Sequence, residues 1–195
     1  MVPFIGLTGG IGAGKSTALD ALERLGAATL STDAVVHELY GSDEVRDAVV
    51  ARWGEDVAPD GTVDRDAVAA HAFGSDADRA WLEELLWPRV GARVAAWREQ
   101  VGARRPPPPA AVVEVPLLFE AGMDGVFDAT IAVVADEPVR AERAAARGHT
   151  AVDERATRQL AQAEKAERAT FAVANSGTEE ELQRKLSAIL ERVNA

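Results

Sequence analysis

The chain alternates between short apolar runs and longer stretches in which apolar residues recur at helical spacing. The apolar runs predict buried strands at residues 3–7, 27–30, 111–115, 129–135 and 171–174. The helical spacing predicts helices at residues 16–25, 34–40, 43–53, 65–73, 78–100 and 140–167, and a last helix that opens at the capping box Thr178-x-x-Glu181. Strands that alternate with helices in this way predict a parallel sheet covered by helices on both faces.

Composition narrows the class of protein. The 195 residues are 47% hydrophobic and 27% charged, which suffices for one domain with small inserted subdomains. A formal net charge of −11 disfavours a long nucleic-acid groove, because such a groove needs many Lys and Arg side chains. The sequence has no cysteine, no signal-peptide pattern and no apolar run long enough to span a membrane. We therefore expect a cytoplasmic protein whose partners are small molecules, with no nucleic acid and no membrane among them.

A glycine-rich motif lies between the first predicted strand and the first predicted helix. Residues 9–16 read Gly-Gly-Ile-Gly-Ala-Gly-Lys-Ser and fit the P-loop pattern G-x-x-x-x-G-K-[ST]. The glycines let backbone N–H groups point at phosphate oxygens, Lys15 reaches the β- and γ-phosphates, and the Ser16 hydroxyl can ligate Mg²⁺. We expect ATP as the phosphoryl donor together with Mg²⁺, bound by Gly10, Ile11, Gly12, Ala13, Gly14, Lys15, Ser16 and Thr17.

The rest of the chain favours a small-molecule kinase over other P-loop proteins. A switch GTPase needs an Asn-Lys-x-Asp motif after a late strand, and Asn175-Ser176-Gly177 stands there instead. The stretch between the second and third predicted strands is almost free of strand-like runs, so we expect a helical insertion that binds the acceptor. The Arg-rich stretch is expected to close as a lid that excludes water. We therefore divide one domain, 1–195, into a core (1–33, 110–139 and 168–195), an acceptor subdomain (34–109) and a lid (140–167).

Two kinds of charged residue are candidates for the chemistry. Asp33 ends the second predicted strand, where its carboxylate can accept the proton of an attacking hydroxyl. The alternative for Asp33 is an N-cap of the helix predicted to begin at residue 34. Arg143 and Arg147 are four residues apart and share a helix face, which suits contact with phosphate. The alternative for these arginines is a solvated face balanced by neighbouring glutamates.

Taken in order, the motifs of this sequence resemble those of the dephospho-coenzyme A kinase family, nearly from end to end. The most specific piece is the run Pro116-Leu117-Leu118-Phe119-Glu120, which is similar to the end of the family's D-x-P-L-L-F-E. The other matching pieces are Thr8 to Thr17, Asp33, Trp53-Gly54, Asp60-Gly61, Asp64-Arg65, Phe73, Leu82-Glu83, Trp87-Pro88, Arg143, Arg147, Arg155, Gln159, Glu164-Lys165 and Asn175-x-Gly177.

The resemblance implies a fold, a reaction and a set of site residues. The fold is a P-loop NTPase with three α/β/α layers, a five-stranded parallel sheet, a helical coenzyme A subdomain and a helical lid. The reaction moves the γ-phosphoryl group of ATP to the 3′-hydroxyl of dephospho-coenzyme A. The implied residues are Asp33, Lys15 and Arg143 for catalysis, Arg147 and Asn175 beside the P-loop for the nucleotide, and Asp33, Arg65, Leu117, Phe119 and Glu120 for the acceptor.

Departures from the family pattern keep alternatives open. Trp87 stands where the family commonly has His, Glu114 replaces an Asp near the magnesium shell, and Ser31 replaces a common acidic residue. Leu117 and Phe119 can also be plain core residues after a strand. The runner-up function is another P-loop small-molecule kinase that acts on a nucleoside or a sugar acid. A non-catalytic nucleotide-binding regulator is disfavoured because both Lys15 and Asp33 are present.

Overall fold

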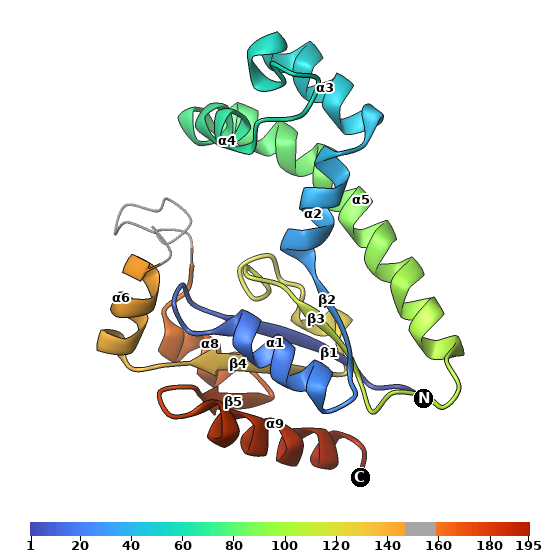
Figure 1. Cartoon of the computed structure of the whole chain (residues 1–195), viewed down its shortest axis with the longest axis vertical. Coiled ribbons are helices and arrows are strands. Elements are labelled where there is room, and N and C mark those ends of the chain that lie inside the picture. Colours follow the sequence, from blue (N-terminus) through green and yellow to red (C-terminus); the bar gives the residue numbers. More distant parts are fainter. Residues whose placement is uncertain (147–158) are drawn as a thin grey trace. The chain divides into compact units, whose positions relative to one another are not determined.

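A five-stranded parallel sheet is the centre of the protein, for which a computed structural model describes residues 1–146 and 159–195 (Figure 1). The strands are β1 (Phe4–Gly9), β2 (Ala28–Ser31), β3 (Ala111–Glu114), β4 (Ala129–Val134) and β5 (Phe171–Ala174). Their spatial order is β2-β3-β1-β4-β5, and every pairing is parallel. This sheet confirms the predicted fold class. Because all five strands run the same way, their carboxyl ends meet at one edge of the sheet.

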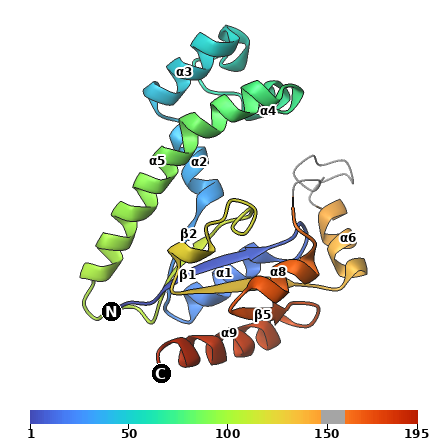
Figure 2. The ribbon, with the colours of Figure 1, turned by 180° about the vertical axis from the view of Figure 1, so that it is seen from behind.

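Helices cover both faces of this sheet (Figures 1 and 2). The helices are α1 (Lys15–Arg24), α6 (Glu137–Ala146), α8 (Gln162–Arg168) and α9 (Glu179–Val193), with a short 3₁₀ turn, η2, at Asp124–Val126. On one face, Leu22 of α1 and Leu186 of α9 pack with Ile5 and Leu7 of β1 in a fully buried core. On the opposite face, the side chains of Leu118 and Phe127 lie so close to Gly6 that a Cβ there would collide with both.

The residues between β2 and the end of the long helix α5 form a helical unit of their own. The described chain divides into two compact units, one made of residues 1–31 and 98–195, the other of residues 32–97. The second unit consists of α2 (Thr32–Tyr40), α3 (Asp43–Trp53), the 3₁₀ turn η1 (Glu55–Val57), α4 (Arg65–Gly74) and most of α5 (Asp76–Ala103). The predicted insertion is therefore helical.

Local signals in the sequence explain where the helices of the second unit begin and end. The Ser42 hydroxyl caps α3 by accepting from Val45 N, and the Asp64 carboxylate caps α4 by accepting from Asp66 N and Ala67 N. These groups satisfy N–H donors that have no partner inside a helix. Gly54, with φ of 92°, ends α3. The Trp53 ring stacks on His71 and packs edge-on against Trp81.

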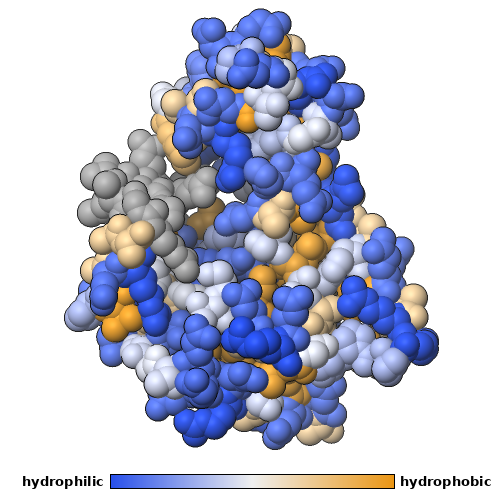
Figure 3. All heavy atoms as spheres, in the orientation of Figure 1, coloured by the Kyte–Doolittle hydropathy of each residue, from blue (hydrophilic) through white to orange (hydrophobic). Residues whose placement is uncertain are grey.

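The surface is polar in keeping with the charge, and hydrophilic residues cover most of the face seen in Figure 3. Across residues 1–146 and 159–195, no helix combines the length and apolarity needed to cross a membrane.

Two sequence-based expectations about helix limits are wrong. The helix predicted at 140–167 is not continuous, because α6 ends at Ala146, α8 begins at Gln162, and residues 159–161 lie outside any helix. The N–H of Leu160 donates to the Glu120 carboxylate at 2.8 Å, a tertiary bond that replaces a helical one. Helix α2 begins at Thr32, so Asp33 lies inside the first turn and is not the N-cap. The predictions for Arg147 and Arg155 fall on 147–158, outside the described residues.

Candidate phosphate-binding site

The P-loop connects the carboxyl end of β1 to the first turn of α1. Its backbone needs glycine, because φ is 75° at Gly12 and 88° at Gly14, in the region that side chains disfavour. Gly14 is the N-cap of α1 and has no side chain with which to cap the helix, and no acidic residue stands in the first turn. The positive end of the helix dipole favours an anion at this position. The local structure suits a phosphate group, and phosphate binding by the loop stays a prediction.

Lys15 and Ser16 are the first two residues of α1, directly after the glycines of the loop. Lys15 is the first residue of α1 and is half-buried, while the next residue, Ser16, is exposed. An accessible hydroxyl next to the loop is a ligand that suits Mg²⁺ carried by a nucleotide. In the described part of the chain, no group of three or more His, Asp or Glu forms a metal site of its own.

Asn175 supports the P-loop from the end of β5. Its side chain is 3% exposed and its Nδ2 donates to the carbonyl of Ala13 at 2.9 Å, across 162 residues of sequence. The backbone carbonyl of Asn175 accepts a hydrogen bond of 2.9 Å from Nη1 of Arg143. A Cβ at Gly14 would collide with the Asn175 amide and lie 3.4 Å from Arg143 Nη1. Arg143 therefore brings its charge beside the loop. Its catalytic role and the nucleotide contact of Asn175 stay predictions.

A buried ion pair fixes the turn that follows β3. Lys165 of α8 is 1% exposed and its Nζ donates to the Pro116 carbonyl at 2.8 Å, while lying 2.9 Å from Glu120 Oε1. The same carbonyl of Pro116 also accepts a hydrogen bond of 3.2 Å from the hydroxyl of Thr8, which lies near the end of β1, just before the P-loop. Glu120 Oε2 is buried and finds no partner among the described residues. The Pro116–Glu120 run is thus bound to both β1 and α8.

The predicted acceptor residues of this run differ in their exposure. Leu117 is partly exposed, whereas Phe119 is 2% exposed. The guanidinium carbon of Arg168 lies over the Phe119 ring, 4.9 Å from the centroid of that ring. Phe119 is thus placed in the core, which is the alternative that the sequence leaves open. The sequence gives no sign of the partner of Glu120, since Lys165 stands 45 residues away in a stretch rich in charge.

Two other predicted site residues belong to the helical unit. Asp33 is exposed, two residues beyond the end of β2, and His37 follows it by one turn of α2 on the same face. Arg65, the first residue of α4, places Nη1 3.4 Å from Nδ1 of His37. The fold of this unit thus brings Arg65 to the helix that carries Asp33. The sequence did not single out His37, which has no motif around it.

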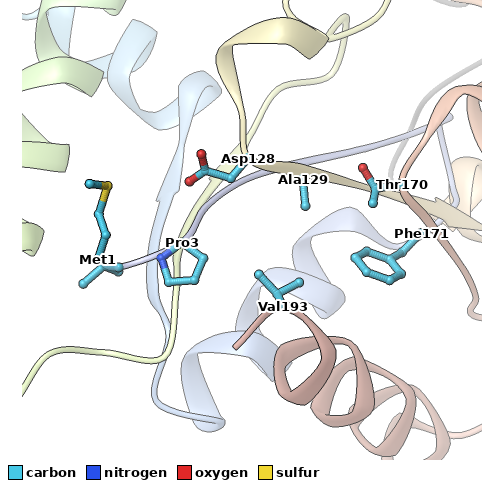
Figure 4. A pocket seen from close by; sticks show the side chains of 8 residues that line it. Met1, Pro3, Asp128, Ala129, Thr170, Phe171 and Val193 are labelled. Atoms are coloured by element: carbon cyan, nitrogen blue, oxygen red, sulfur yellow. The ribbon is translucent and has the colours of Figure 1, made fainter. Parts of the chain in front are cut away.

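A separate pocket of about 430 Å³ lies at the opposite edge of the sheet (Figure 4). It is lined by residues at the amino ends of β1, β4 and β5 and near the end of α9, namely Met1, Val2, Pro3, Asp128, Ala129, Thr170, Phe171 and Val193. The carboxylate of Asp128 accepts a hydrogen bond of 2.8 Å from the backbone N–H of Phe4, the first residue of β1. Because the P-loop follows the carboxyl end of β1, this pocket is not part of the phosphate site.

The sheet order, the P-loop between β1 and α1, and the helical insertion after β2 together define a P-loop phosphotransferase. A sequence model of the dephospho-CoA kinase family matches residues 3–181. A dephospho-CoA kinase of Moorella thermoacetica is 40% identical over 167 residues, with 85% of this chain and 78% of the relative covered. One of Deinococcus radiodurans is 38% identical over 192 residues, with 97% and 91% covered. The chain belongs to the dephospho-CoA kinase family.

Solved structures show the same architecture. The crystal structure of TT1252 from Thermus thermophilus matches with a TM-score of 0.81 and 30% identity, covering 100% of this chain and 99% of that one. A dephospho-CoA kinase from Campylobacter jejuni matches with a TM-score of 0.70 and 19% identity, covering 100% and 98%. A shikimate kinase from Acinetobacter baumannii shares the fold at a TM-score of 0.52 and 13% identity. The last two likenesses bear on the fold alone.

Proposed function

We propose that this protein transfers the γ-phosphoryl group of ATP to the 3′-hydroxyl of dephospho-coenzyme A and releases coenzyme A and ADP. The observation that carries the proposal is a complete P-loop, with Gly14 as the N-cap of α1 and a half-buried Lys15, in a chain whose family match spans residues 3–181. Activity in the cytoplasm is part of the same proposal and rests on the expectation from sequence.

The donor side of the reaction relies on stabilisation of charge. The loop N–H groups and the Lys15 ammonium bind the β- and γ-phosphates, and Arg143, beside Gly14, adds charge as the γ-phosphoryl group moves. Ser16 would hold Mg²⁺, and Glu114, 8% exposed at the carboxyl end of β3, provides a carboxylate at the same edge of the sheet. When bound there, Mg²⁺ would supply positive charge that neutralises charge on the phosphate groups.

The acceptor side of the reaction needs a general base and a group that binds the acceptor. Asp33 accepts the proton of the 3′-hydroxyl while that oxygen forms a bond to the γ-phosphorus and the bond from that phosphorus to ADP breaks. Arg65 binds the pyrophosphate of the acceptor by paired hydrogen bonds, for which an exposed guanidinium is suited. Leu117 and Glu120 complete the acceptor site in this proposal.

One assay tests the proposed reaction. ADP release is measured with dephospho-coenzyme A, and in parallel with shikimate, sugar acids and nucleosides, and mass spectrometry identifies the product. We expect rapid ADP release and coenzyme A with the first acceptor alone, and a loss of nearly all turnover in Lys15→Ala. Arg46→Ala is the control for loss of a cation, since Arg46 lies on α3 and pairs with the exposed carboxylates of Asp43 and Asp47. Faster turnover with a nucleoside or sugar acid would replace the proposal with the runner-up.

A further inference from the structure

The orientation of the peptide groups in the P-loop depends on donors outside the loop. A trans peptide holds its C=O and N–H on opposite sides, so a carbonyl fixed outward turns the next residue's N–H inward. Each outward carbonyl also needs a donor if it is shielded from water. The Gly10 carbonyl finds one in the loop itself, from Ala13 N at 3.2 Å. The carbonyls of Ile11 and Ala13 accept hydrogen bonds from side chains that are distant in sequence.

Arg140 of α6 is the donor to Ile11. Its Nε lies 3.0 Å from the Ile11 carbonyl oxygen, 129 residues away along the chain. Its Nη2 is 3.1 Å from the position of a Cβ built on Gly10, and a Cβ on Gly12 would collide with the Arg140 carbonyl. The backbone of α6 therefore packs directly on the loop. Only 23% of the Arg140 side chain is exposed, so the bond to Ile11 is partly shielded from water.

We propose that Arg140 is a positioning residue of the phosphate site, which fixes the Ile11–Gly12 peptide so that the Gly12 N–H points at the nucleotide phosphates. Asn175 does the same for the Ala13–Gly14 peptide, through the bond to the Ala13 carbonyl. The two donors hold alternate peptides of the loop. Arg140 acts through the backbone and needs no contact with substrate. This inference rests on nucleotide binding by the P-loop, which is part of the proposed function.

A simpler role for Arg140 is its ion pair with Glu137, three residues earlier on α6. Nη1 lies 2.8 Å from Glu137 Oε2, whose side chain is 78% exposed. Such exposed pairs contribute little, and this one uses a different nitrogen from the one that reaches Ile11. The substitution Glu137→Gln removes the ion pair and leaves the bond to Ile11, so it is the matched control for any substitution of Arg140.

The test compares Arg140→Met, Arg140→Gln and Glu137→Gln in the full chain. Calorimetric titration gives the affinity for a non-hydrolysable ATP analogue with Mg²⁺, and steady-state kinetics give the KM of each substrate. We expect Arg140→Met to weaken analogue binding and raise the KM for ATP about tenfold, the size of one charge-assisted hydrogen bond. The KM for dephospho-coenzyme A and the thermal midpoint stay unchanged, and Glu137→Gln stays within about twofold of the parent in every measurement.

Arg140→Gln separates the hydrogen bond from the charge. Its amide can donate to Ile11 without a cation, so partial recovery of affinity relative to Arg140→Met supports the positioning role. In ¹H–¹⁵N spectra, the shift of the Gly12 amide caused by the analogue shrinks in Arg140→Met and persists in Glu137→Gln. Analogue affinity within twofold of the parent in Arg140→Met, or an equal loss in Glu137→Gln, overturns the inference. A parallel rise of both KM values with a lower thermal midpoint also overturns it, since that marks general damage to the fold.

The binding measurement needs no acceptor. If dephospho-coenzyme A is not phosphorylated, the proposed function fails while the analogue titration still decides the role of Arg140.

Discussion

At the scale of single residues, the proposed reaction gives different chemical tasks to Asp33 and to the P-loop. The loop stabilises charge on phosphate, whereas Asp33 removes a proton from the acceptor. Asp33 lies in the first turn of α2, where a carboxylate also benefits from the helix dipole. Because the residue is exposed, its replacement tests chemistry with little effect on the fold.

Asp33→Asn is expected to lower kcat by about 10²-fold or more while the affinity for ATP changes little, since general-base catalysis typically contributes that much. Asn keeps the shape but cannot take a proton. Steady-state kinetics with a separate titration of the ATP analogue make the measurement, and Asp47→Asn, another exposed aspartate in the helical unit, is the control. A parallel fall in turnover and ATP affinity would instead make Asp33 a ligand of the metal–nucleotide complex.

Lys165 shows how one buried charge binds three segments together. It lies on α8 and touches both ends of the Pro116–Glu120 run, which in turn is bonded to Thr8. Removing one partner of a buried pair leaves the other charge without compensation. The pair therefore contributes to stability mainly through the penalty that follows when it is broken.

We expect Lys165→Met to lower the free energy of unfolding by about 3–5 kcal/mol, as for other buried pairs broken on one side. Glu120→Leu should also destabilise, and the double variant Lys165→Met/Glu120→Leu should cost less than the sum of the two single changes. Urea denaturation of each protein gives these values, with Lys185→Met as the exposed control. Strictly additive losses would show that the two side chains do not interact.

At the scale of elements, a polar contact joins α3 to α5 in the helical unit. Nε and Nη2 of Arg52 lie 3.0 and 2.8 Å from Oδ1 of Asp78, and the indole Nε1 of Trp53 donates to the same oxygen at 3.2 Å. The hydrogen bond from Arg52 is the main cause that lowers the pKa of Asp78, and Trp53 adds to it. The Trp53 ring also stacks on the His71 ring of α4 and packs edge-on against the Trp81 ring of α5.

The lowered pKa of Asp78 predicts a loss of stability in acid. The contribution of a carboxylate with a depressed pKa is fully present above its unfolded pKa, about 3.9, and is lost as the pH falls through the lower folded value. The difference in unfolding midpoint between the parent and Asp78→Asn is therefore expected to be constant near neutral pH and to shrink below about pH 4. Asp76→Asn on the same helix is the control. A difference independent of pH would contradict this account.

At the scale of the whole molecule, the proposal gives separate tasks to the two compact units. Residues 1–31 with 98–195 carry the P-loop, and residues 32–97 carry Asp33 and Arg65. The net charge of −11 is no obstacle to this proposal, because the proposed contacts to both substrates come from local cations and backbone N–H groups. Changes in one unit should then affect one substrate more than the other.

Arg65→Ala is expected to raise the KM for dephospho-coenzyme A by about tenfold and to leave the KM for ATP unchanged, since a charged hydrogen bond is worth about that factor. Kinetics with each substrate varied in turn make the comparison. Arg46→Ala, which removes a helix-surface arginine paired with Asp43 and Asp47, is the matched control. An unchanged acceptor KM would leave the helical unit without its proposed role and favour the generic kinase alternative.

The sequence predicted those features whose determinants are close together in the chain. The P-loop spans residues 9–17, and its conformation follows from local glycines. Helix α3 has the predicted limits because Ser42 caps it and Gly54 ends it. Strand β5 was predicted from its own apolar run. These signals are local, and secondary structure responds first to local constraints.

Only the tertiary structure decided which distant residues serve the site. Glu120 binds Lys165 and Leu160 N, Asn175 binds Ala13, and Arg140 binds Ile11, at separations from 40 to 162 residues that no local pattern encodes. The bond from Leu160 N to Glu120 lies in residues 159–161, which are not helical although one helix was predicted at 140–167. Sequence determined the motif proposed to bind phosphate, because its backbone chemistry is built into consecutive residues. Packing determined the donors that hold that motif in shape, because buried polar groups must find partners wherever the fold brings them.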